Sequence, residues 1–140
     1  VKNGGFEALE KLSAEAKKYI APLPIDYEPD EEAAGMFGLM MMTSGKHTDP
    51  ENVAKAQALK DATMGWFIAQ NLKSKFVHLN GNYHSDFKKG IITYLNKYRP
   101  GLKIATVCSV RQDDIKKLGE ENEGRADFYI CVPTDMTMTY

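Results

Sequence analysis

The residues best suited to chemistry in this sequence form one run, Asn80-Gly81-Asn82-Tyr83-His84-Ser85-Asp86. The imidazole of His84 could bind a metal ion, form hydrogen bonds or transfer a proton. Gly81 would allow a sharp turn, and the backbone amides near Ser85 would attract a carboxylate or phosphate if a helix begins there. The alternative is structural, because Asn, Ser and Asp are also common in turns and helix caps. The residue types alone favour this structural interpretation.

Two predicted elements would position this run. The apolar residues of 75–80 predict a strand, and those of 85–98 predict a helix with Phe87 on its apolar face. A second strand is predicted at 103–110, and a strand, a helix and a strand in this order form a βαβ unit with parallel strands. Because ligands of open parallel sheets bind at the carboxyl ends of the strands, we expect a ligand pocket here. Its predicted residues are Asn80, Gly81, Tyr83 and His84.

The sheet continues with a third predicted strand at 127–132, after a short helix at 113–118 and a charged, solvated stretch from Lys116 to Arg125. Three parallel strands are too few for a sheet that is covered on both faces. Residues 1–72 are predicted to be helical, so the missing sheet partners must come from an upstream part of the protein or from a second chain. The predicted fold class is therefore α/β, a parallel β-sheet with flanking helices plus a small all-helical region, in an incomplete domain.

The chain is expected to divide into a helical region at 1–72 and a βαβ portion at 73–140. The helical region begins with a predicted helix at 5–20, which places Tyr19 among the core residues. A short helix is predicted at 31–42, with acidic residues at its start and methionines at its end.

A longer helix is predicted after this methionine-rich segment. Thr48 or Asp49 could cap it, and Pro50 suits its first turn. The helix should end near residue 72. Its expected buried side consists of Val53, Ala56, Leu59, Thr63, Phe67 and Leu72.

Composition argues against several classes of function. The 140 residues include 18 basic and 19 acidic side chains, a formal net charge of −1, which leaves no basic surface for nucleic acid. No apolar run approaches the ~20 residues that cross a bilayer. Because the chain begins at Val1, the lack of a targeting segment carries little information. Cys108 and Cys131 are expected to be buried free thiols, or a disulfide if the protein is exported.

Two segments of the chain, AQALKDATMGWFIAQNL and KFVHLNGNYHSDFKKGIITYLNKYRPGLKIATV, resemble the C-terminal half of the ChaN-like haem-binding uptake proteins of the Tiki superfamily. The features that carry the resemblance are Ala56-Gln57, Asp61-Ala62-Thr63-Met64, the turn from Gly81 to His84, and Arg99-Pro100. The resemblance is close over about 54–108 and weaker near both ends. The family's first half, with a strand that ends in Gly-Glu and a following histidine, is missing from this sequence.

The resemblance implies a parallel sheet and a helical part that holds haem. It also implies a bacterial cell-envelope lipoprotein, anchored to the membrane and facing the periplasm or the cell surface, that takes part in haem or iron uptake. In the family a tyrosine ligates haem and a histidine assists across a dimer interface, so a homodimer is a further expectation. Asp61 and Met64 join the expected pocket, because a buried Asp61 could orient the ring of His84; a solvated helix face is the alternative for Asp61.

Haem needs an apolar slot and an axial donor. The methionines of 36–42 would supply an adaptable apolar surface, although they would also suit a helical core. Tyr27 and His47 lie on either side of this segment. The expected haem contacts are Tyr27, Met36, Met40, Met41 and His47.

The rival hypothesis is a metal-dependent or esterase-like hydrolase of the same superfamily with its site around His84. The acidic residue and histidine that such a site would take from the upstream half are missing, and no HExxH, GxSxG or P-loop motif occurs. The chain is therefore expected to bind a ligand rather than to catalyse a reaction. A third alternative is a structural piece whose only partner is the rest of its own domain.

Overall fold

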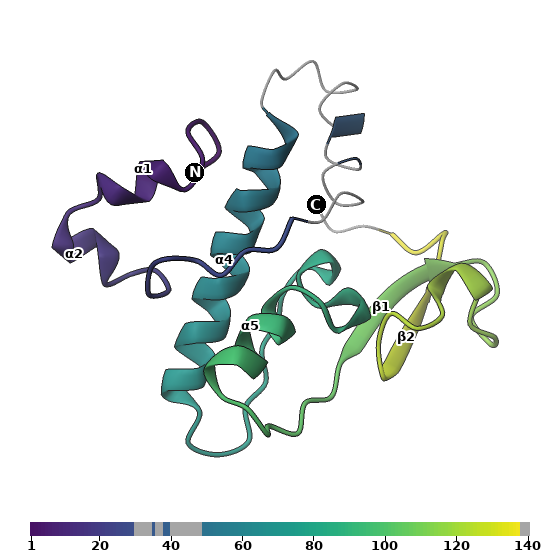
Figure 1. Ribbon diagram of the computed structural model, residues 1–140. Helices are drawn as coiled ribbons and strands as arrows, with labels where there is room; N and C mark the ends of the chain where they lie inside the picture. The colour runs from purple at the N-terminus through teal and green to yellow at the C-terminus, as the bar shows by residue number, and fades with distance from the viewer. Residues whose placement is uncertain (30–34, 36–37, 40–48, 138–140) are drawn as a thin grey trace. The chain divides into compact units, whose positions relative to one another are not determined.

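The computed structural model describes residues 1–29, 35, 38–39 and 49–137. The chain divides into two compact units, Val1–Asn71 and Leu72–Tyr140. Figure 1 shows the helices and strands in chain order, coloured by residue number. Most of the methionine-rich helix predicted for 31–42 lies outside the described residues.

The first unit begins with two short helices, α1 (Glu7–Glu10) and α2 (Ala14–Lys17). The prediction of one helix over 5–20 is therefore wrong. The interruption has a local cause, because Ser13 adopts an extended conformation and its hydroxyl accepts a hydrogen bond from the Ala16 N–H at 3.1 Å. Ser13 is thus the N-cap of a new helix rather than the middle of a longer one.

The long helix of this unit, α4 (Pro50–Asn71), confirms the helix predicted after the methionine-rich segment. Pro50 occupies its first position, where the missing N–H of proline costs no hydrogen bond. Asp49 precedes it, and its Oδ1 accepts a hydrogen bond from the Glu51 N–H at 3.0 Å. Asp49 is therefore the cap that the sequence offered as one of two alternatives.

The buried side of α4 differs from the predicted one. Val53 is buried as expected, but Phe67 is partly exposed. Tyr19, which precedes α4 in the chain and was also expected in the core, is 69% exposed. Five of the eight buried residues are alanine or glycine. Small residues permit a neighbouring segment to approach the helix closely. The prediction had instead placed mainly bulky side chains on the buried side. The buried residues of α4 are Val53, Ala54, Ala58, Asp61, Ala62, Gly65, Ile68 and Ala69.

The segment between α2 and the methionine-rich region packs on α4. The Ala21 N–H donates a hydrogen bond to Thr63 Oγ1 at 3.2 Å, and Ala21 is almost fully buried. Farther along, the Tyr27 ring packs against Val53 and Ala54. These contacts make the first unit a helix with an extended segment laid along it.

In the second unit, the strand predicted at 75–80 is not formed, since none of these residues pairs with a strand. Residues 75–79 are exposed and belong to no helix or strand, and Leu79 is 90% exposed. The sequence pattern suits a strand, but a strand also needs hydrogen bonds to a neighbour. The prediction is therefore wrong for this structure because the pairing is missing.

The helix predicted for 85–98 begins later than expected. Two 3₁₀ turns, η1 (Asn82–His84) and η2 (Asp86–Lys88), come first, and the helix itself is α5 (Ile91–Tyr98). Phe87, Lys88 and Gly90 have φ values of 56°, 57° and 57°. A left-handed backbone cannot continue a right-handed helix. Phe87, expected on the apolar face of the helix, is 56% exposed instead.

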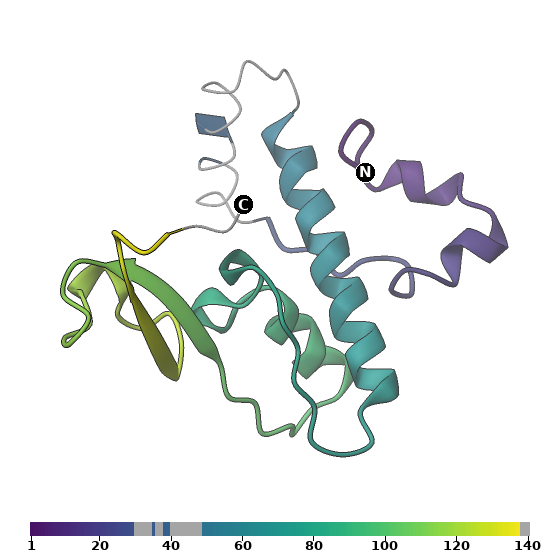
Figure 2. The same cartoon turned by 180° about the vertical axis from the view of Figure 1, so that it is seen from behind.

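Two parallel strands, β1 (Val107–Gln112) and β2 (Phe128–Pro133), form the sheet, with Cα partners from Val107–Phe128 to Gln112–Pro133 (Figure 2). They correspond to the strands predicted at 103–110 and 127–132, shifted toward the C-terminus. The α/β class, helices combined with a parallel sheet, is confirmed. One sheet face is buried along β1; the other is exposed at Val107, Phe128 and Ile130.

The helix predicted at 113–118 is wrong, because this segment folds as turns around a buried side chain. Gln112 Nε2 donates a hydrogen bond to the Lys117 carbonyl at 2.6 Å, and Gln112 Oε1 accepts one from the Gly119 N–H at 3.1 Å. A short 3₁₀ turn, η3 (Glu120–Asn122), follows.

Candidate ligand site

The predicted run of polar residues forms a compact turn, which we call the ligand turn (residues 80–86). Asn80 Nδ2 donates hydrogen bonds to the Gly81 carbonyl at 2.9 Å and to Ser85 Oγ at 3.0 Å. The His84 N–H donates to the Gly81 carbonyl at 2.9 Å, which closes η1. Several hydrogen-bond donors and acceptors of the turn are thus bonded to one another, as the structural interpretation expected.

Tyr83 and His84 form a ring pair on this turn. Their ring centroids lie 5.4 Å apart at an interplanar angle of 80°, an edge-to-face arrangement. The Tyr83 side chain is 40% exposed and His84 is half-buried. The pair therefore presents a phenol and an imidazole, two groups that can ligate iron, on an accessible surface.

Gly81 is not where the backbone needs a glycine. Its φ of −67° and ψ of 143° are open to any residue, so the expectation that Gly81 supplies a sharp turn is wrong. The glycine that the geometry requires is Gly90, with φ 57° and ψ −121°.

One end of the ligand turn is attached to the sheet. Asn82 Nδ2 donates a hydrogen bond to the Ser109 carbonyl of β1 at 2.9 Å. The Thr106 carbonyl points toward β2, where it accepts from the Phe128 N–H at 3.0 Å. Because carbonyls alternate between the two sides of a strand, the Ser109 carbonyl lies on the other edge of β1. Asn82 therefore occupies part of the edge at which a further strand would pair.

The other end of the ligand turn contacts the segment before β2. Arg125 donates two hydrogen bonds to Asp86 Oδ2, from Nη2 at 2.7 Å and from Nε at 3.1 Å. The Phe87 N–H donates to the Arg125 carbonyl at 2.8 Å. Lys88 Nζ forms an ion pair with Asp127 Oδ1 at 2.6 Å. Asp86, Phe87 and Lys88 thus all contact the segment 125–127.

These contacts are ion pairs, and they shift the pKa values of the groups that form them. The hydrogen bond from Lys88, followed by those from Thr106, lowers the pKa of Asp127 to about 2. The hydrogen bond to Asp86 raises the pKa of Arg125. The expectation that the charged stretch ending at Arg125 is merely solvated is wrong at this residue, because Arg125 is half-buried. No local signal marks it, since its partner is 39 positions away in the sequence.

Cys108 lies beside the same carboxylate, with its Sγ 3.5 Å from Asp86 Oδ1. Burial and then the negative charge of Asp86 raise the pKa of this thiol. A thiol in this state is a poor nucleophile. Both cysteines are free, and the expectation of a buried free thiol is confirmed for Cys108. It is wrong in part for Cys131, which is free but only half-buried.

The remaining predicted site residues lie elsewhere or outside the described residues. Asp61 and Met64 belong to α4 in the first unit, where Asp61 is 4% exposed and Met64 is half-buried. Tyr27 packs on α4 and meets the Phe6 ring edge-on at 5.6 Å between centroids. The structure thus brings together Asn80, Gly81, Tyr83 and His84 in one unit. Outside the described residues lie Met36, Met40, Met41 and His47.

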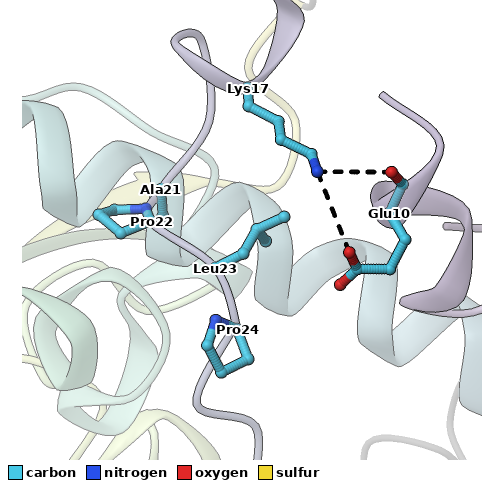
Figure 3. A pocket seen from close by; sticks show the side chains of 6 residues that line it. All are labelled: Glu10, Lys17, Ala21, Pro22, Leu23 and Pro24. Atoms are coloured by element: carbon cyan, nitrogen blue, oxygen red, sulfur yellow. Dashed lines mark hydrogen bonds and ion pairs between the residues drawn. The ribbon is translucent and has the colours of Figure 1, made fainter. Parts of the chain in front are cut away.

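A hollow of about 620 Å³ in the first unit contains none of the predicted site residues (Figure 3). Pro22, Leu23 and Pro24 form its apolar wall. Lys17 Nζ at its rim donates a hydrogen bond to the Glu10 carbonyl at 3.4 Å and lies 4.0 Å from Glu10 Oε2. Since its cation already has a carboxylate partner, this hollow is a weaker candidate than the ligand turn.

Two further properties limit the chemistry of the described chain. Among residues 1–29, 35, 38–39 and 49–137, no group of three His, Cys, Asp or Glu side chains is arranged to hold a metal ion. Within the same ranges, the helices are all too short or too polar to span a bilayer.

Comparison with known protein families gives a match over much of the chain. A family model described as haem-binding uptake, Tiki superfamily, ChaN matches residues 1–95. The match covers the first unit, the ligand turn and the start of α5, and ends before β1. No curated protein and no solved structure matches the chain.

Proposed function

This chain belongs to the ChaN family of haem-binding uptake proteins in the Tiki superfamily, and from that premise we propose that it binds haem at the cell envelope and takes part in haem or iron uptake. The observation that carries the proposal is the Tyr83–His84 ring pair, which lies within the matched residues on a turn attached at both ends.

The residues of the ligand turn fit haem in their chemistry. Phenol oxygen and imidazole nitrogen are both axial donors to haem iron, and the accessible aromatic faces suit a flat apolar macrocycle. When bound, haem would supply an iron centre with open coordination positions. We assign Tyr83 and His84 as its contacts on this turn, with Asn80 keeping the turn closed through Ser85.

The expected haem contacts of the first unit are a separate part of this proposal, and the contacts of the ligand turn do not depend on them. We propose Met36, Met40 and Met41 as apolar contacts to haem, and Tyr27 and His47 as further donors. Asp61 and Met64 share one side of α4, because residues three apart are neighbours on a helix. The burial of Asp61 supports a role in orienting another group rather than contact with solvent.

The proposal includes a location and a partner. We place the protein in the bacterial envelope as a membrane-anchored lipoprotein that faces the periplasm or the surface. The apolar side chains of 76–79 and the exposed sheet face support a partner that completes the sheet. That partner is the upstream half of the same domain or a second chain, which in a homodimer would be a copy of this one.

Titration with hemin tests the function. The wild-type chain should give a shifted Soret band that saturates at a fixed stoichiometry. His84→Ala and Tyr83→Phe should each weaken binding by about tenfold or more, the scale of losing a direct or supporting metal contact. His78→Ala is the matched control, since His78 lies in the exposed segment before the turn and should leave the titration unchanged.

A flat hemin titration of the wild type would contradict the proposal. So would tight zinc or manganese binding that is lost in His84→Ala, because that result would support the hydrolase hypothesis instead.

A further inference from the structure

We propose that Arg125 is a positioning residue for haem binding: through Asp86 it fixes the end of the ligand turn that orients the Tyr83–His84 ring pair. The inference rests on the proposed haem-binding role of the ligand turn. Arg125 lies beyond the residues that match the family, so the assignment comes from the contacts of this structure alone.

The backbone after the ligand turn is strained. Phe87 and Lys88 both have left-handed φ values, 56° and 57°, which are unfavourable for residues with a side chain. The Phe87 ring is 56% exposed, so burial of its own side chain does little to offset this strain. Other contacts must hold these two residues in place.

The contacts with the segment 125–127 are the ones that do so. Arg125 makes two contacts here, one through its side chain to Asp86, which precedes the strained residues, and one through its carbonyl to the N–H of the strained Phe87. Lys88 adds its ion pair with Asp127, whose second carboxylate oxygen accepts hydrogen bonds from the Thr106 N–H and hydroxyl at 2.8 and 3.0 Å. Every residue from 86 to 88 is thus tied to a neighbour of β2.

Arg125 is itself held in one position. Its Nη1 donates to Asn122 Oδ1 at 2.8 Å, and the buried Asn122 side chain lies 3.4 Å from Gln112 Oε1 on β1. The guanidinium therefore joins a buried amide pair to the Asp86 carboxylate. A planar, multidentate donor can do this, whereas a lysine ammonium can satisfy only part of it.

The effect on the ring pair follows from the short connection. Asp86 is two residues after His84, and Asn82, one residue before Tyr83, is bonded to β1. With both ends attached, the two rings are carried by a turn of fixed geometry. If the Asp86–Arg125 pair is removed, the ligand turn keeps its attachment at Asn82 but loses the one at Asp86. The strained residues are then held only by the Phe87 N–H bond and the Lys88–Asp127 ion pair, and can relax toward ordinary φ values more easily.

The test uses the full chain and the variants Arg125→Ala, Arg125→Lys and Arg111→Ala. Arg111 is the matched control, because it is an arginine of the same unit whose Nη2 donates to the carbonyls of Thr134 and Met136 instead. Without haem, trypsin should cleave after Lys88 and Lys89 about tenfold faster in Arg125→Ala, the scale expected for loss of a charged, part-buried hydrogen bond. Arg111→Ala should match the wild type.

With hemin at saturation, Arg125→Ala should show a changed Soret maximum and a changed ferric-haem electron paramagnetic resonance spectrum. Weaker binding alone would fit a merely structural role, whereas an altered ligand signature reports the position of the rings. Arg125→Lys should restore part of the wild-type signature. If Arg125→Ala does not fold, Lys88→Ala, which removes a partly exposed contact with the same segment, should give smaller changes in the same direction. In this variant cleavage is followed after Lys89 alone, because trypsin does not cleave after alanine.

Wild-type rates of cleavage after Lys89 in both Arg125→Ala and Lys88→Ala would overturn the proposal. Faster cleavage with an unchanged haem signature would overturn it too, because the contact would then hold the turn without positioning the rings. A wild-type chain that does not bind hemin at all is a different result: it removes the proposed function, and this inference with it, whatever the cleavage rates.

Discussion

Asp127 illustrates how much of the second unit depends on single side chains. One of its carboxylate oxygens pairs with Lys88 and the other accepts hydrogen bonds from the backbone and side chain of Thr106. Asp86 has a comparable role with Arg125. The sequence marked Asp86 as a residue able to do chemistry, but its partner could not be predicted, because nothing in local composition couples positions 86 and 125.

The lowered pKa of Asp127 predicts a stability change in acid. A carboxyl group whose pKa is about 2 when folded and near 3.8 otherwise stabilises the fold above pH 3.8 and loses this contribution as the pH falls toward 2. The free energy of unfolding in urea should therefore fall over this window in the wild type, and fall less steeply in Asp127→Asn. Asp135→Asn, which changes an exposed carboxylate of the same unit, should keep the wild-type slope. Equal slopes in all three proteins would contradict the assignment.

The two free thiols should react at different rates. The pKa of Cys108 is raised by burial and by Asp86, so this residue should stay protonated at neutral pH and react slowly with iodoacetamide. Cys131 is only half-buried and should be labelled first. Mass spectrometry of the time course, with Cys131→Ser as the control that leaves Cys108 alone, measures both. Faster labelling of Cys108 would mean that this thiol is neither buried nor beside Asp86.

At the scale of elements, the accuracy of prediction depended on whether the signal was local. The helix α4 was predictable because its cap and first residue, Asp49 and Pro50, stand together in the sequence. The sequence predicted a parallel sheet, because the strands of such sheets are apolar runs. Whether 75–80 forms a strand could not be determined from its own residues, because a strand forms only when it pairs with another, and the local pattern does not show whether such a partner is present.

Backbone conformation gives a prediction that reverses the sequence-based expectation for two glycines. Gly90→Ala should destabilise the second unit by roughly 1–3 kcal/mol, because its φ of 57° and ψ of −121° exclude a side chain. Gly81→Ala should change stability by less than about 0.5 kcal/mol, since Gly81 has an ordinary φ and no atom within 4 Å of an added Cβ. Urea denaturation of both variants measures these two losses in the free energy of unfolding. A larger loss for Gly81→Ala would restore the original expectation.

At the scale of the whole molecule, apolar exposure is unequal between the two units. Of the large apolar side chains that stand exposed among the described residues, most belong to the second unit. Six of these lie in the segment 76–79 or on one face of the sheet. This agrees with the sequence-based argument that a sheet of so few strands lacks cover. The haem-binding hypothesis, by contrast, came from a resemblance and not from any rule of composition, and the ligand turn is the part of the site that residue types could indicate.

The exposed sheet face gives a prediction for the chain as a whole. Phe128 and Ile130 are 61% and 55% exposed on the same face of β2, a contiguous apolar surface of the kind that associates. The double variant Phe128→Ser/Ile130→Ser should therefore bind less of the dye ANS and self-associate less in sedimentation than the wild type. The control is Tyr19→Ser, which removes an equally exposed aromatic residue from the first unit and should change neither measurement. If the double variant instead unfolds, these two side chains contribute to the core of the unit, and the sheet face needs no partner to cover it.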